Sequence, residues 1–166
     1  HQDFPVEGVE WPTSAAGSDG WLVSVEENPI SMSVSISVWN VSDDRGNMIS
    51  GEPWGSSPAV VISGSSLVLH DSHRLDFYEL ESNSTDFSPK FSRNESEALL
   101  DVAIAESATG QPLLVMVHED YLEVVDDEQT PAEFEVSGEA FSIVAASGQL
   151  VAWADGTSSS PTVNVT

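Results

Sequence analysis

The chain has 166 residues, of which 40% are hydrophobic, enough to form one folded domain spanning residues 1–166. Lys and Arg total four against 28 Asp and Glu, so the formal net charge is -24, which disfavours binding to nucleic acid and anionic membranes. The absence of cysteine excludes disulfides and thiolate metal sites, and no apolar run reaches the roughly 18 residues of a membrane span.

The acidity itself has three interpretations. It keeps a protein soluble in high salt, it attracts Ca²⁺ or another divalent cation to oxygen-rich loops, or it forms a solvated surface with no specific ligand. Lys90 is the only lysine, which favours the first interpretation. We expect no tightly bound cofactor.

The first part of the chain predicts strands that end at clear turn signals. Residues 4–10 form an extended run, and residues 21–25 form an apolar strand. Apolar side chains then alternate with polar ones from Met32 to Val38, which is typical of a strand with one buried face. Residues 43–47, Asp-Asp-Arg-Gly-Asn, predict a turn.

The rest of the chain repeats this pattern without any sustained helical periodicity. The middle of the chain predicts strands over residues 59–63, 67–69, 75–80 and, at a sheet edge because Pro89 interrupts it, 87–91. The following part predicts strands over residues 100–105, 113–117, 121–125 and 132–136. The last part predicts strands over residues 141–145, 150–153 and 162–165. The fold class is therefore all-β.

A spacing of 42 residues relates the apolar runs that begin at Val60, Val102 and Val144. Repetition at 40–50 residues in a β-rich chain is typical of propeller blades. We predict about four 42-residue, four-stranded units, with residues 4–10 closing the last blade beside residues 162–165.

The predicted third strands of the units also resemble those of propeller blades. Residues 38–41, 77–80 and 122–125 look like the aromatic-aliphatic third strand of a blade, and in this the chain resembles WD-repeat-like β-propellers. The Trp-Asp and Gly-His signatures of that family are absent. The resemblance implies a ring of four-stranded blades. The alternatives are half of a larger ring, a fragment of one, or a β-sandwich or jelly roll.

Two turns contain histidine and are the main candidate sites. His70, Asp71 and His73 belong to the turn after the second strand of the second unit. His118, Glu119 and Asp120 occupy the equivalent turn of the third unit, so the repeat places both turns on one face. These residues suit a divalent cation or a partner, but hairpin turns are also commonly polar. We favour partner contact and assign no metal ligand.

Other residues give weaker candidates. His1 resembles the amino-terminal copper ligand of histidine-brace oxygenases, although the surrounding sequence does not. Residues 43–47 and 126–128 concentrate carboxylates but lack the spacing of a twelve-residue calcium loop.

The five tryptophans divide by their surroundings. Trp21, Trp39 and Trp153 lie within strand alternation and are expected in the core. Trp11 and Trp54 adjoin prolines in loops, and of the two we select Trp54 as a partner contact.

Four Asn-x-Ser/Thr sequons indicate a glycosylated protein at the cell surface or outside the cell. Their asparagines are Asn40, Asn83, Asn94 and Asn164.

No motif assembles a nucleophile, a base and an oxyanion site. We therefore expect a non-catalytic protein-interaction or assembly module that binds a protein partner or itself. The alternatives are a structural subunit of a surface filament or coat with strand exchange, and a metal-dependent or glycan-processing hydrolase. The hydrolase requires His70 and His118 to converge in one pocket.

Overall fold

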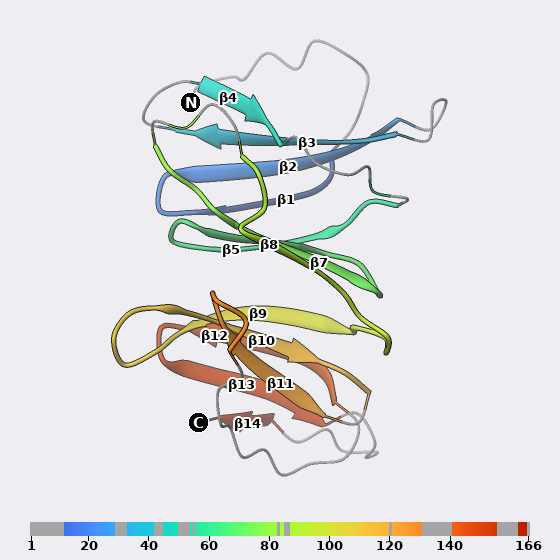
Figure 1. Ribbon diagram of the computed structural model, residues 1–166, viewed down its shortest axis with the longest axis vertical. Coiled ribbons are helices and arrows are strands. Elements are labelled where there is room, and N and C mark those ends of the chain that lie inside the picture. The colour runs from blue at the N-terminus through green and yellow to red at the C-terminus, as the bar shows by residue number, and fades with distance from the viewer. Residues whose placement is uncertain are drawn as a thin grey trace.

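The computed structural model describes most of the chain and contains strands but no helix among the residues that it describes (Figure 1). Accordingly, no described helix is long and apolar enough to cross a membrane. The described residues are 12–28, 33–41, 45–49, 54, 56–82, 84, 87–119, 121–130, 141–155 and 163–165.

Within the described residues, fourteen strands form four separate antiparallel sheets, each a simple meander in chain order. The first sheet contains β1 (Pro12–Ser18), β2 (Trp21–Asn28), β3 (Ser33–Asn40) and β4 (Arg45–Met48). The second contains β5 (Ala59–Ser63), β6 (Ser66–His70), β7 (Arg74–Glu79) and β8 (Phe91–Asn94). The third contains β9 (Asp101–Glu106), β10 (Pro112–Val117) and β11 (Leu122–Asp126). The fourth contains β12 (Phe141–Ser147), β13 (Leu150–Asp155) and β14 (Val163–Val165).

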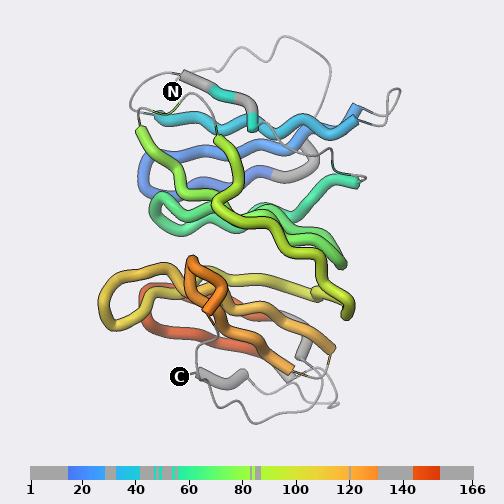
Figure 2. The backbone as a smooth tube through the Cα atoms, viewed as in Figure 1, coloured from blue at the N-terminus to red at the C-terminus, as the bar shows by residue number. Residues whose placement is uncertain are grey.

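The sheets follow one another in a row, with the first and fourth at opposite ends (Figures 1 and 2). Three apolar clusters fill the three spaces between neighbouring sheets. The second sheet contributes to two of them, because Leu67 and Leu69 face the first sheet while Val68 faces the third. A strand buried on both faces reads as an uninterrupted apolar run.

The first strand of every sheet contacts the first strand of the next one, in the series β1, β5, β9 and β12. Polar contacts join these strands and the hairpins that follow them. The Gly64 amide donates to Ser18 Oγ at 3.1 Å, and the Val144 amide donates to Asp101 Oδ2 at 2.9 Å. The four sheets are therefore linked along one side by their first strands.

Three predictions in the first half of the chain need correction. The turn predicted over residues 43–47 is too long, because strand β4 begins at Arg45. The first unit begins at β1, nine residues before Trp21, because the small side chains of residues 14–18 gave no apolar signal. The predicted strand over residues 87–91 is wrong in its bounds: Phe87 forms only an isolated bridge with Ile49, and the edge strand β8 starts at Phe91.

The ring closure cannot be placed from these residues. Residues 4–10 and the expected strand over 132–136 lie outside the described residues. β14 pairs with β13, and none of the four sheets closes on itself among the described strands. Four small sheets, rather than the two packed sheets of a sandwich, account for the described strands.

Candidate functional site

The two histidine-containing turns lie at the same end of the second and third sheets. In one, Asp71 Oδ1 accepts hydrogen bonds from the amides of His73 and Arg74, both at 2.8 Å. In the other, the His118 amide donates to the carbonyl of Tyr121 at 2.9 Å. The intervening segment, residues 95–100, forms backbone hydrogen bonds with Ser72, His73 and Val117 and so connects the two turns.

An ion-pair cluster joins these sheets beside the second turn; we call it the Arg93 cluster. Its members come from the second sheet, the segment after it, and the third sheet: Arg93, Glu95, His118, Tyr121 and Glu123. Arg93 Nε lies 2.9 Å from Glu95 Oε1, and Arg93 Nη2 lies 3.1 Å from Glu123 Oε2. Arg93 Nη1 also donates to Glu123 Oε1 at 3.1 Å, so this pair is bidentate.

His118 is the most buried member of the Arg93 cluster, with only 1% of its surface exposed. Its ring stacks on that of Tyr121, with 4.3 Å between centroids and 14° between planes. Its Nε2 atom lies 3.8 Å from Glu123 Oε2, and neither ring nitrogen has a hydrogen-bond partner in the described part of the chain. Burial, and next the nearby Glu97 carboxylate, raise the pKa of Tyr121.

His70 is also buried, but the structure does not bring it into the Arg93 cluster. Its neighbouring charges are Asp101 and Asp71. Burial lowers the pKa of His70, and the Asp71 backbone and then the Asp101 and Asp71 carboxylates oppose that effect only in part. The hydrolase hypothesis required the His70 and His118 rings within hydrogen-bonding reach, and no described hydrogen bond joins them.

Trp54 is a core residue, with 6% of its surface exposed, so its prediction as an exposed partner contact is wrong. It packs in the cluster between the first and second sheets, and the Arg74 guanidinium lies 4.3 Å from the centroid of its ring. Arg74 in turn forms an ion pair of 2.6 Å with Asp76, which is 1% exposed. The Trp54 ring thus contacts Arg74 of the same chain, in a cation–π interaction, instead of a partner protein.

The tryptophans on the strands differ from one another. Trp21 and Trp153 are buried as expected. Trp39 is 37% exposed, because it alternates with the fully buried Val38 and occupies the opposite, outer face of β3. Its prediction as a core residue is wrong.

The remaining predicted contact residues are at the surface or outside the described part. His73 and Glu119 are exposed and Asp71 is half-buried, whereas Asp120 lies outside the described residues. Among the sequon asparagines, Asn94 is exposed at the end of β8 and Asn40 is half-buried at the end of β3. Asn83 and the side chain of Asn164 lie outside the described residues, as do His1 and Trp11.

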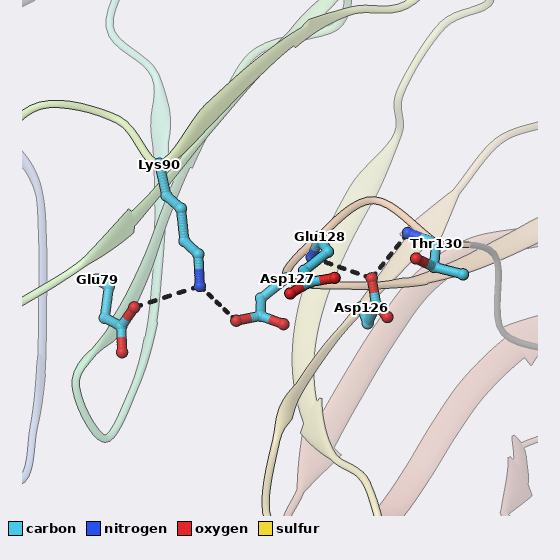
Figure 3. Close-up of polar contacts among 6 residues, drawn as sticks. All are labelled: Glu79, Lys90, Asp126, Asp127, Glu128 and Thr130. Atoms are coloured by element: carbon cyan, nitrogen blue, oxygen red, sulfur yellow. Dashed lines mark hydrogen bonds and ion pairs between the residues drawn. The ribbon is translucent and has the colours of Figure 1, made fainter.

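The acidic turn after β11 is closed by its own backbone rather than arranged around a cation. Asp126 Oδ1 accepts hydrogen bonds from the Glu128 amide at 3.0 Å and the Thr130 amide at 2.7 Å (Figure 3). Next to it, Lys90 binds both Glu79 of the second sheet and Asp127 of this turn (Figure 3). Lys90 therefore forms a second charged bridge between the same two sheets.

A cavity of about 230 Å³ lies beside this second bridge. Its walls include Glu79, Asp127 and the hairpin residues Ser63 and Ser66. Ser66 begins β6 and His70 ends it, so the cavity and the histidines lie at opposite ends of that strand. None of the three described histidines lines the cavity.

Sequence reasoning missed Arg93, Glu95 and Glu123. With only four Lys and Arg residues in the chain, each cation was a signal for an ion pair. The chain has 28 carboxylates, however, so the sequence alone does not show which of them pairs with a given Lys or Arg.

The comparisons with known proteins concern the fold alone. No protein-family model matches the chain, and no curated protein matches it. A solved structure described as a luciferin-regenerating enzyme is similar, with a TM-score of 0.53 and 10% sequence identity over 88% of this chain and 54% of that chain. The chain thus spans about half the length of that structure.

Proposed function

We propose that the chain is a non-catalytic assembly module, made of successive β-propeller blades, that associates with a second copy of itself. The observation behind this proposal is the contact series of β1, β5, β9 and β12. In a propeller the sheets are arranged radially around a central channel. Consecutive sheets that meet through their first strands fit that arrangement, with these strands nearest the axis.

The outer faces of the two end sheets support association. On the first sheet, Trp39 pairs with Leu22 across β3 and β2, on the face opposite the core. On the fourth sheet, Leu150 is 60% exposed and lies on the same outer face as Ala145 and Ala152. Another sheet packed on these faces would bury the apolar side chains, as the inner sheets already do for one another.

The lengths of this chain and of the similar solved structure favour a second copy of the chain as the partner that covers these outer faces. This chain matches 54% of a longer β structure, so two copies supply about the same amount of chain. The enzyme named for that structure shares only 10% identity, which gives no support for its chemistry here. We extend the proposal to a surface or extracellular protein, because Asn94 of one sequon is exposed at a strand end.

Light scattering at increasing salt concentration tests this association. Each copy carries a net charge of -24, so repulsion opposes pairing until salt screens it. We expect the mass to rise from the 17.7 kDa of one chain toward twice that value between low and molar salt.

Three variants locate the contact. Trp39→Ser and Leu150→Ser each remove an apolar side chain from an end sheet and should raise the dissociation constant of the dimer at least about tenfold. Leu100→Ser removes a side chain that is 45% exposed but lies between β8 and β9, away from both outer faces, and should leave the constant unchanged. A monomer at every salt concentration, or equal effects of all three variants, contradicts the proposal.

A further inference from the structure

We propose that Glu95, His118 and Glu123 of the Arg93 cluster bind a divalent transition-metal ion such as Zn²⁺. Each residue offers one ligand atom, and these atoms lie within 4.8 Å of one another. This site is independent of the proposed self-association, since it lies between the second and third sheets rather than on an end sheet.

The state of His118 is the observation that points to a ligand. Its side chain is 99% buried by the fold, yet neither ring nitrogen has a hydrogen-bond partner among the described residues. Buried polar groups are nearly always paired, because desolvation without a partner is unfavourable. Nε2 lies 3.8 Å from Glu123 Oε2, which is too long for a hydrogen bond but leaves space for an ion near both atoms.

The distances allow a metal ion after a side-chain movement. Zinc binds nitrogen and oxygen ligands at about 2.0–2.2 Å in a tetrahedron, so two ligands of one ion are about 3.3–3.6 Å apart. A spacing of 4.8 Å, the limit for these three atoms, therefore closes by a little over 1 Å, about the shift that a change of side-chain torsion gives. The Glu123 side chain is 27% exposed and supplies the movable ligand, whereas packing against Tyr121 holds the imidazole.

Charge and ligand type select the ion. The carboxylates of Glu95 and Glu123 and the guanidinium of Arg93 have a net charge of -1, which attracts a cation. A neutral imidazole adds a nitrogen ligand without changing that charge. Imidazole with carboxylate suits zinc and similar ions, while Ca²⁺ and Mg²⁺ prefer shells made of oxygen. We expect the site to select Zn²⁺ over the calcium that the acidic surface attracts.

Isothermal titration of the whole chain with Zn²⁺, in buffer with excess Ca²⁺ to occupy the acidic surface, tests the site. We expect one ion to bind per chain in the wild type. His118→Gln and Glu123→Gln should each weaken that binding by at least about 10–100-fold, because losing even a group that only orients a metal ligand costs that much. His73→Gln is the matched control, because it removes an exposed imidazole from the neighbouring turn.

An NMR spectrum of the imidazole ¹⁵N nuclei detects the metal ligand directly. The signals missing from the spectrum of His118→Gln belong to His118, and Zn²⁺ should shift them. The signals of His73, assigned in the same way from His73→Gln, should not move. If His118→Gln does not fold, Glu123→Gln decides, since the latter changes a partly exposed side chain. Equal zinc affinity in the wild type and both ligand variants, or a loss in His73→Gln of the same size, overturns the proposal.

Discussion

At the scale of single residues, two histidines beside the turns, His70 and His118, are buried although turn residues are usually exposed. His70 and His118 were expected at the surface because they fall next to hairpin turns, yet they are 5% and 1% exposed. Each follows the last apolar residue of a central strand, and the adjoining sheet and the segment over residues 95–100 cover that end. Burial of an imidazole makes the stability of the fold depend on pH.

The buried imidazole of His70 predicts a pH-dependent stability. Burial lowers its pKa in the folded state, so below about pH 6.5 the unfolded chain binds more protons and stability falls. Between pH 7.5 and 5.5 the wild type should lose more stability than His70→Gln does, by at most about 1.4 kcal/mol, the limit for an imidazole that stays neutral in the folded chain. Urea unfolding at the two pH values measures the difference. His73→Gln, at an exposed position, should follow the wild type, and identical losses in all three proteins would contradict the assignment.

At the scale of elements, the hairpin between the first and second strands repeats across the sheets. Two-residue turns occupy this place in the first, second and fourth sheets, where Ser18 pairs with Trp21, Ser63 with Ser66, and Ser147 with Leu150. Each contains a glycine at positive φ: Gly20 at 86°, Gly64 at 57° and Gly148 at 56°. Such φ values match the right-handed twist of a hairpin and exclude most other residues.

The turn at Gly148 allows a direct test of this requirement. A Cβ there would contact nothing within 4 Å, so any cost of substitution comes from the backbone rather than from a clash. Gly148→Ala should lower the free energy of unfolding by about 1 kcal/mol, and Gly148→Asn by clearly less, because asparagine tolerates this region. Chemical denaturation compares the two variants. Equal effects of alanine and asparagine would show that φ is not the cause.

At the scale of the whole molecule, two of the four basic residues connect the second and third sheets. Arg93 of β8 reaches Glu123 of β11, and Lys90, just before β8, reaches Asp127, just after β11. The apolar cluster between these sheets includes Val68 and Leu114. The charged bridges thus lie at the outer edge of an apolar contact, where they help fix the orientation of neighbouring sheets.

The two bridges should differ in strength. The Arg93 side chain is 22% exposed and bidentate with Glu123, whereas the Lys90 side chain is 37% exposed. Arg93→Gln should lower the free energy of unfolding by about 1–2 kcal/mol, and Lys90→Gln by about 0.5 kcal/mol or less. Urea unfolding at low and high salt checks this, since salt should reduce the Lys90 effect more strongly. Equal losses in the two variants at either salt concentration would contradict it.

The hydrophobic pattern predicts the all-β class and most of the described strands. Alternation in β2, where Val23 and Val25 are buried and Ser24 is not, marks a sheet with one covered face. The continuous run Leu67-Val68-Leu69 marks a sheet covered on both faces. The β1 strand escaped prediction because its residues are small and polar.

The sequence by itself determined the all-β class, the 42-residue repeat and the acidic surface, because side-chain alternation and turn residues act over short stretches of chain. Only the tertiary structure decided that Trp54 is covered by Arg74, that Trp39 faces outward, and that Arg93, His118 and Glu123 meet. The contact between Arg93 and Glu123 joins residues that are 30 positions apart on different sheets. Sheet packing sets their positions, and no local pattern encodes which carboxylate among 28 reaches a given cation.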